Sequence, residues 1–245
     1  MQGGFAAFSI EPMRADDYER CIEVAAAAFN TNNPIMKHAG LSEEHYLRYA
    51  ERSCSKGKCV DTGLSLVARS RSDGELLAFL FLKTFDPFEK LDAELTRQSR
   101  TLAGLVELVT GLYDKAVMSL RLGSMATGKA LSCSMGGTLP NANGQGVGKA
   151  LRLRACEVAR ERGFNTLLVE PAHGATRHIW TKHCGGVVHA ELSSETFASK
   201  KRDYPLKGSQ QDVSVVEVVL RRAQRDWEVY RLYYLAKMVV LSVFK

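Results

Sequence analysis

The chain has 245 residues, 45% of them hydrophobic and 24% charged, which suits a soluble globular domain with a full core. Its formal net charge is +6. The Lys and Arg residues are scattered rather than grouped in long blocks, which argues against a nucleic-acid-binding protein and favours a smaller anionic ligand.

The N-terminal part of the chain predicts one strand followed by two helices. An apolar run at Phe5–Pro12 indicates the strand. Asp16 is the expected N-cap of the first helix, because Glu19 follows it at the spacing of a capping box. The polar segment Asn30–Pro34 ends that helix, and Ser42 is the expected cap of the second helix.

Two apolar runs, at Leu64–Arg69 and Leu76–Phe85, indicate strands joined by a turn at Ser72–Gly74. The second run is apolar on both faces, as expected for a strand buried from both sides. Residues 86–127 then form an insert that is predicted to be helical, because apolar side chains within Leu102–Leu120 recur at helical spacing. Substrate specificity, added packing and a dimer surface are three roles that this insert leaves open.

A glycine-rich loop follows a strand expected at Lys129–Leu139 and precedes a helix expected at Val147–Arg162. Gly144, Gly146 and Gly148 alternate in the loop. Such glycines let backbone N–H groups point inward together and form an anion-binding nest, to which the N-terminal end of the helix adds positive potential. The sequence therefore predicts a phosphate or pyrophosphate site at this loop.

Two common phosphate-binding loops do not match this stretch. A Walker A loop requires G-x-x-x-x-G-K-[ST], but Gly148 and Lys149 are followed by Ala150, which lacks the hydroxyl that holds Mg²⁺. A dinucleotide fingerprint requires G-x-G-x-x-G, and neither Gly144 nor Gly146 begins such a pattern.

A third pattern fits. The stretch resembles motif A of the GCN5-related N-acetyltransferase (GNAT) superfamily, V-x-P-x-x-[QR]-G-x-G-x-[GA], which wraps the pyrophosphate of acetyl-CoA. Thr138 stands at the Val position, Pro140 matches the proline, and the three loop glycines match the glycines of the motif. Asn143 stands where Gln or Arg is usual, a departure that affects one side-chain contact and leaves the backbone nest intact.

The resemblance implies a fold of the α/β (α+β) class, with a single domain over residues 1–220 that contains the insert. Its sheet is mixed, mostly antiparallel and six- to seven-stranded, it splays between strands 4 and 5, and helices cover both faces. An insert in this position resembles the arylalkylamine-acetyltransferase-like branch. The remaining expected elements are strands at Asn165–Glu170, Val187–Leu192 and Val213–Leu220 and a helix at Ala172–Cys184.

The activity that the resemblance implies is direct transfer of an acetyl group from acetyl-CoA to a primary amine, more often of a small molecule than of a protein. Acetyl-CoA is then a co-substrate, and no metal is expected. The alternative is a catalytically silent acyl-CoA-binding module, and a nucleotide-binding protein is a further rival.

The resemblance also implies which residues form the site. Gly136 and Gly137 mark a bulge or a close ligand approach in the fourth strand, whose N–H groups would hold the oxyanion. Arg152 is either a phosphate contact or a solvated charge. Phe29 and Asn33 are expected to line the acceptor site. A core aromatic residue at Phe29 and a helix stop at Asn33 explain these two residues at least as well. The expected CoA-binding residues are Gly137, Thr138, Leu139, Asn143, Gly144, Gln145, Gly146, Val147, Gly148 and Lys149, and the expected acceptor-binding residues are Phe29 and Asn33.

The usual proton-transfer residues of the family are missing from their places. Trp180 or Thr181 stands where the resemblance places an acidic Tyr, and Ser132–Ser134 stands where many relatives carry a Glu. His183 is the expected catalytic proton carrier, because histidine titrates near neutral pH. A solvated or packing histidine, and transfer without a dedicated acid, are the alternatives.

Three histidines in this region raise the question of a metal. His173, His178 and His183 are five residues apart, so they do not share one face of an α-helix, which argues against a metal site. Cys54 and Cys59 lack a second ligand pair at zinc spacing, and reduced thiols are the favoured interpretation.

Residues 221–245 indicate an extra C-terminal amphipathic helix, whose apolar part is too short to span a bilayer. Docking on the domain, a homodimer contact and a membrane-surface anchor are the roles considered for it. Met1–Ser9 lacks the features of a secretory signal. We therefore expect a cytoplasmic protein without a transmembrane span.

Overall fold

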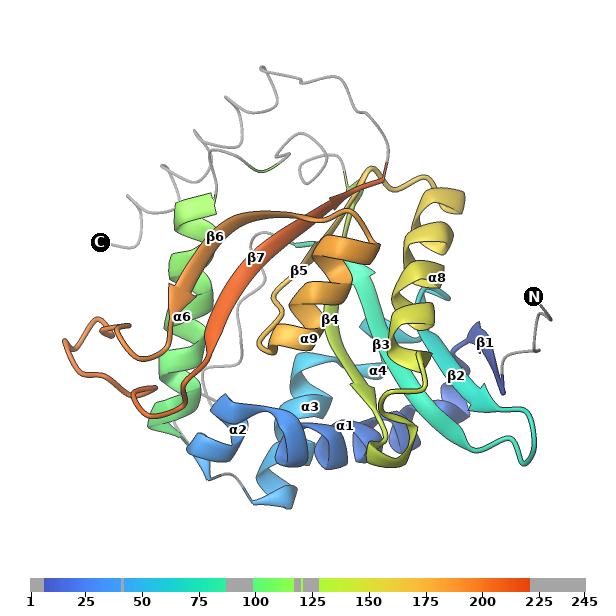
Figure 1. Ribbon diagram of the computed structural model, residues 1–245, viewed down its shortest axis with the longest axis horizontal. Coiled ribbons are helices and arrows are strands. Elements are labelled where there is room, and N and C mark those ends of the chain that lie inside the picture. The colour runs from blue at the N-terminus through green and yellow to red at the C-terminus, as the bar shows by residue number, and fades with distance from the viewer. Residues whose placement is uncertain (1–6, 41, 87–98, 117–119, 121–127, 221–245) are drawn as a thin grey trace.

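The computed structural model describes residues 7–40, 42–86, 99–116, 120 and 128–220, which form one mixed α/β domain (Figure 1). A seven-stranded sheet lies at its centre in the order β1-β2-β3-β4-β5-β7-β6. Neighbouring strands are antiparallel except for the parallel pair β4–β5. The strands are β1 (Phe8–Pro12), β2 (Leu66–Ser70), β3 (Leu76–Thr84), β4 (Ala130–Thr138), β5 (Thr166–Val169), β6 (Val187–Ser193) and β7 (Asp212–Val219).

The fold class predicted from the sequence is confirmed, and each predicted strand is present in the sheet. β4 and β5 run parallel because a loop and a helix carry the chain back across one face of the sheet between them. This crossover places the glycine-rich loop directly at the end of β4, next to the only parallel pair among the described strands.

Helices cover both faces of the sheet (Figure 1). Helix α8 and the π-helical turn η3 lie on one face of the sheet and contribute to the same apolar cluster. Helices α1 and α3 pack on the opposite face, and α6 covers the β5–β7 side of that same face. The helical elements are η1 (Ala15–Asp17), α1 (Tyr18–Asn32), α2 (Pro34–Ala39), α3 (Glu43–Ser53), α4 (Lys56–Cys59), α6 (Arg100–Ala116), η2 (Pro140–Ala142), α8 (Val147–Glu161), α9 (Gly174–His178) and η3 (Ile179–His183).

Strand β3 is buried from both sides, as its uninterrupted apolar run predicts. Leu80 lies in the cluster under α8, whereas Phe79 and Phe81 lie in the cluster under α1, and all three side chains are fully buried. Each such side chain contributes about 1.5–3 kcal/mol of burial free energy. β3 and its partner β4 therefore form the rigid centre from which the site is built.

The first helix begins differently from the expectation. Asp16 is not its N-cap, because the turn η1 precedes α1 and Asp17 is the residue at the boundary. The Asp17 carboxylate accepts a hydrogen bond from the backbone N–H of Arg14 (2.9 Å) and forms an ion pair with Arg69 of β2. Sequence spacing cannot reveal this partner, since Arg69 is 52 residues away along the chain.

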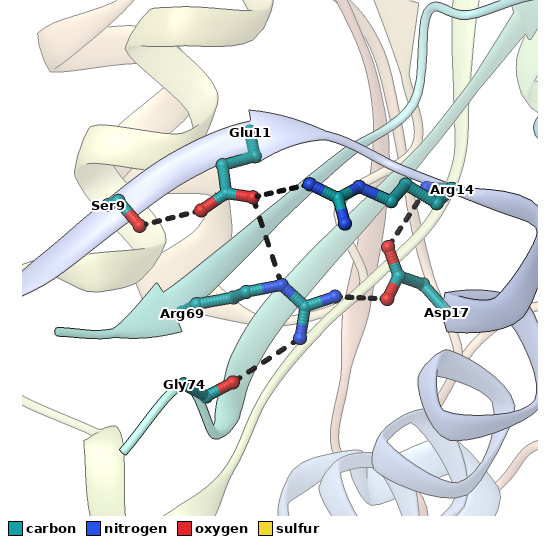
Figure 2. A network of polar contacts seen from close by, with 6 residues as sticks. All are labelled: Ser9, Glu11, Arg14, Asp17, Arg69 and Gly74. Atoms are coloured by element: carbon teal, nitrogen blue, oxygen red, sulfur yellow. Dashed lines mark hydrogen bonds and ion pairs between the residues drawn. The ribbon is translucent and has the colours of Figure 1, made fainter. Parts of the chain in front are cut away.

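Figure 2 shows the polar network around that ion pair. Glu11 of β1 lies 3.8 Å from Arg14 and 4.0 Å from Arg69, and it accepts a hydrogen bond from Ser9 at 2.9 Å. Arg69 also donates to the carbonyl of Gly74 in the β2–β3 turn at 3.3 Å. The network thus fastens β1, the start of α1 and the β2–β3 hairpin to one another.

The predicted helical insert is confirmed over α6. Its remaining residues 87–98, 117–119 and 121–127, and the helix predicted at 221–245, lie outside the described residues. Within the described part of the chain, no helix combines the length and the apolar character that crossing a membrane requires.

Candidate active site

The glycine-rich loop has the backbone that an anion nest requires. Gly144 and Gly146 adopt φ angles of +79° and +80°, which lie in the left-handed region, and Gly146 is the N-cap of α8. The Gln145 side chain donates to the carbonyl of Asn141 at 2.8 Å and so braces the loop from within. The first-turn amides of α8 have no acceptor within the helix, as at any helix start, so they are positioned to face an anion.

The side chains of the loop are open to solvent. Asn143, Gln145 and Lys149 are all exposed, so they can reach a ligand without rearrangement of the core. A Cβ atom added to Gly148 would lie 3.1 Å from Arg152 Nη1 and 3.3 Å from Thr138 Oγ1. The third glycine is therefore explained by the close packing of α8 against the end of β4.

An opening in the sheet begins beside this loop. β4 and β5 are paired only from Ala130↔Thr166 to Cys133↔Val169, whereas β4 continues to Thr138. The chain leaves the sheet after β5 and turns into α9. The β5-facing edge of β4 beyond Cys133 is therefore unpaired in the described sheet, as expected for strands that splay apart.

A bulge on β4 lies at the start of this opening. Phe81 pairs with Met135 and Leu82 pairs with Cys133, which leaves Ser134 as the extra residue. The bulge is thus not at Gly136–Gly137, where the sequence suggested it. Those glycines are required for another reason, because a Cβ at Gly137 would lie 2.8 Å from the ring of Phe79.

The bulge also decides which amides face the opening. Leu139 donates its N–H to the carbonyl of Leu77 in β3 at 2.8 Å, so this amide cannot bind a ligand. Amides alternate in direction along an antiparallel ladder, and the register Ala78↔Thr138 therefore points the Thr138 N–H away from β3 and toward the opening. We expected the oxyanion donors among the amides of Gly137, Thr138 and Leu139, and of these only the amide of Thr138 faces the gap.

Arg152 lies beneath the opening and is not the solvated charge considered above. It is 8% exposed, its Nη1 donates to the carbonyl of Gly148 at 2.8 Å, and its guanidinium lies 5.7 Å from the centre of the Trp180 ring. Desolvation lowers the pKa of Arg152 from its ordinary value. Trp180 itself is 1% exposed and belongs to the core, as do Val147, Leu151, Ala155 and Val158 on the predicted buried face of α8.

A carboxylate that sequence reasoning missed lies on the other side of the opening. Glu170 directly follows β5, and the hydroxyl of Tyr113 in α6 donates a hydrogen bond to it. Desolvation raises the pKa of Glu170 above its ordinary value of 4.5, while the Tyr113 hydrogen bond and the nearby Lys83 charge act in the opposite direction. The available sequence signal was an acidic residue at the carboxyl end of a buried parallel strand.

Aromatic and thiol groups surround Glu170. Burial raises the pKa values of Tyr113, Tyr49 of α3 and Cys133 of β4, and the nearby Glu170 charge raises them further. The pKa of Tyr49 and that of Cys133 are both raised to about 12. All four side chains nevertheless keep partial solvent access. Glu170 is therefore a desolvated carboxylate among aromatic side chains and a thiol, all of them partly accessible to solvent.

The expected acceptor-binding residues have structural roles. Phe29 stacks on Tyr46 with ring centroids 5.5 Å apart and packs in the same cluster as Leu139. Asn33 is buried, and its Oδ1 accepts hydrogen bonds from the N–H groups of Ile35 and Met36 (3.0 and 3.2 Å), so it is the N-cap of α2. Their contact with an acceptor stays a prediction.

The histidines after β5 are arranged differently from the expectation. The imidazole rings of His178 and His183 lie edge to face with their centroids 5.6 Å apart, because the chain forms a π-helical turn, whose i→i+5 hydrogen bonding brings residues five apart to the same side. The statement that they share no face was therefore wrong for this pair. His173 is separate and caps α9, with its Nδ1 accepting from the N–H of Ala175 at 3.2 Å.

His183, the expected proton carrier, is exposed on that turn, and its role stays a prediction. Among the described residues, no group of three or more His, Cys, Asp or Glu side chains is arranged to hold a metal ion. All six cysteines lie in the described part of the chain, and none of them forms a disulfide there.

The comparisons with known proteins give a fold and no sequence match. No protein-family model and no curated protein sequence matches the chain. Arylalkylamine N-acetyltransferase 2 from Aedes aegypti is 14% identical, with a TM-score of 0.65, and the match covers 87% of this chain and 99% of that one. The polyamine N-acetyltransferase of Drosophila melanogaster is 13% identical, with a TM-score of 0.61 and coverage of 86% and 99%.

The chain has the GNAT fold. A further structure with this fold is the C-terminal condensation domain of Ebony in complex with beta-alanyl-dopamine, which is 14% identical, with a TM-score of 0.67 and coverage of 87% and 99%. The GNAT architecture explains why the glycine-rich loop, the end of β4 and the start of α8 converge at one opening in the sheet.

Proposed function

We propose that this chain is an acyl-CoA-dependent N-acyltransferase that moves an acetyl group directly onto the primary amine of a small molecule. One observation carries the proposal. The opening between β4 and β5 has an anion-binding loop on its α8 side and a desolvated carboxylate, Glu170, on its α6 side. Direct transfer needs a donor site and a proton acceptor on opposite sides of one passage.

The residues present fit acetyl-CoA as the co-substrate. The loop from Asn143 to Lys149 provides an exposed backbone with left-handed glycines for the pyrophosphate. The edge of β4 beyond Cys133, which is unpaired on its β5 side, provides backbone hydrogen-bonding groups for an extended, amide-containing arm. When bound, acetyl-CoA supplies an acetyl group activated as a thioester.

Glu170 is the proposed general base. An amine is protonated at neutral pH and must lose a proton before or during attack on a carbonyl carbon. The raised pKa of Glu170 makes its carboxylate a stronger base than an exposed glutamate, and the Tyr113 hydroxyl orients it. The Thr138 N–H is the proposed donor to the oxyanion that forms after attack. His183 is kept as a second candidate proton carrier.

The acceptor side suits a cationic amine. Tyr49, Tyr113 and Phe29 supply aromatic surface, and Glu170 supplies the negative charge that attracts an ammonium group. The names of the arylalkylamine and polyamine acetyltransferases support this assignment, while the beta-alanyl-dopamine bound to Ebony indicates that a shared fold does not fix the acyl group. The proposed compartment is the cytoplasm, where cysteine thiols stay reduced.

The test is release of CoA thiol from acetyl-CoA in the presence of a panel of arylalkylamines, polyamines and amino acids. We expect turnover with at least one primary amine. Glu170→Gln is expected to lower kcat/KM about 10²–10⁴-fold, because it removes the base, and to leave acetyl-CoA affinity unchanged.

Glu161→Gln is the matched control, since Glu161 is exposed on α8 and pairs only with the partly exposed Arg154 among the ion pairs described. It is expected to retain full activity. Binding of acetyl-CoA with no turnover on any amine would instead identify a silent acyl-CoA-binding module. Tighter binding of ATP than of acetyl-CoA would favour a nucleotide-binding protein.

A further inference from the structure

Arg152 is a buried cation whose charge is not matched by a carboxylate. It is 8% exposed, its Nε has no hydrogen-bond partner, and the groups whose charges act on it are the thiols Cys133 and Cys184. Among the described residues, no acidic side chain forms an ion pair with it. Burying a charge without an opposite charge beside it is costly. A buried, unpaired cation is therefore expected at a functional site, where a bound ligand supplies the negative charge.

The position of Arg152 indicates where that ligand lies. Its Nη1 and the Thr138 Oγ1 converge on Gly148, at 3.1 and 3.3 Å from the position that a Cβ atom on Gly148 would occupy. It is therefore close to Thr138, whose amide faces the opening, and to Cys133, where the β4–β5 ladder ends. The guanidinium thus lies on the α8 side of the passage, opposite Glu170.

We infer that Arg152 stabilises the thiolate that leaves when the acyl group is transferred. This inference rests on the proposed function. In the step, the amine nitrogen forms a bond to the carbonyl carbon and its proton passes to Glu170. The carbon–sulfur bond breaks, and its electron pair goes to the sulfur of CoA. The guanidinium then supplies the positive charge next to that thiolate, so no acid needs to protonate it during bond breaking.

The surroundings of Arg152 fit a charge-stabilising role. Trp180 holds the guanidinium from one side at 5.7 Å and has no acidic proton to give. The bond to the Gly148 carbonyl fixes Nη1 and leaves Nε available. The pKa values of the two nearby thiols shift in opposite directions. Burial raises the pKa of Cys133 to about 12, whereas a hydrogen bond with the Cys156 thiol and the charges of Arg152 and Arg160 lower the pKa of Cys184.

The test measures the thiol of bound CoA without any turnover. Calorimetric affinities for CoA and for desulfo-CoA are compared from about pH 6 to about pH 9, since a free thiol titrates near pH 8.5. Protein groups that titrate in this range do so in both complexes, and their effects cancel in the ratio. In the wild type, preference for CoA should rise with pH, by up to about tenfold for each unit by which Arg152 lowers the thiol pKa.

Arg152→Met should abolish this pH-dependent preference, and Arg152→Lys should keep part of it. Arg154→Met is the matched control, because Arg154 lies on the same helix and pairs with Glu157 and Glu161 at the surface. The Met variant should unfold at the same or a higher temperature, because it replaces an unpaired buried charge by an apolar side chain. If it does not fold, Arg152→Gln serves in its place.

Three results would overturn the inference. A flat ratio in the wild type would show that the bound thiol is not affected. Equal weakening of CoA and desulfo-CoA in the Met variant would assign Arg152 to the phosphates, and an unchanged ratio with a lower unfolding temperature would assign it to structure alone. Failure of the wild type to bind either ligand would instead refute the proposed function.

Discussion

Gly146 illustrates how much of the candidate site depends on single residues. Its φ of +80° makes it the left-handed N-cap from which α8 starts, and the neighbouring Gly144 has a similar conformation. No atom lies within 4 Å of a Cβ added at either position. The requirement for glycine there is therefore conformational rather than steric.

We expect Gly146→Ala to destabilise the protein by about 1 kcal/mol, because an L-residue is strained in the left-handed region. The strain also tilts the loop amides, so CoA affinity should fall by about tenfold. Thermal unfolding and calorimetric titration check the two effects. Gly174→Ala is the control, since Gly174 has no left-handed φ and no neighbour within 4 Å. Equal effects of both substitutions would contradict the nest.

At the scale of elements, the β1–η1–β2 network of Figure 2 fixes the entry to α1. Asp17 is 7% exposed and joins the backbone of Arg14 to the Arg69 side chain. Helix α1 in turn carries Phe29 and packs on β3 and β4. The position of Phe29 therefore depends on a polar contact far from the proposed chemistry.

Asp17→Asn should lower the free energy of unfolding by about 1–3 kcal/mol, because it leaves Arg69 partly buried without its anion. Urea unfolding measures this change. Glu11→Gln provides the comparison: its contacts with Arg14 and Arg69 are 3.8 and 4.0 Å long and more exposed, so its loss should cost less than about 1 kcal/mol. A larger effect at Glu11 would show that the network is centred elsewhere.

At the scale of the whole molecule, three apolar clusters share one sheet. The cluster under α8 fills one face, and the clusters under α1 and α6 fill the other. β7, the last strand along the described chain, ends at Val219. The N–H of Leu220 still donates a hydrogen bond to the carbonyl of Asn165 at 2.8 Å. We therefore propose that residues 1–220 form one folding unit, as the resemblance implied.

A chain that ends at Leu220 should unfold in a single cooperative transition and bind CoA as tightly as the full chain, because all seven strands of the described sheet and the loop lie within residues 1–220. Calorimetry of both forms provides the measurement. Loss of cooperativity or of CoA binding in the shorter chain would mean that the C-terminal segment belongs to the domain.

The sequence by itself determined the strands, the loop and helix α8, and through them the fold. Each of these is written in local patterns: apolar runs for β2 and β3, glycines at alternate positions in the loop, and 3.6-residue periodicity in α8. The polar segment Asn30–Pro34 was correctly predicted to end the first helix. That Asn33 also starts α2 follows from its side-chain oxygen, which pattern alone does not reveal.

Only the tertiary structure decided what surrounds the opening. Tyr113 and Glu170 are 57 residues apart, yet they share a hydrogen bond. Arg152 has the pattern of a surface residue and is buried under the π-turn, and an extra residue at Ser134 determines which β4 amides face the gap. The physical reason is common to all three. Local sequence encodes backbone conformation, whereas the desolvation and partners of a charged group depend on segments that only the folded chain brings together.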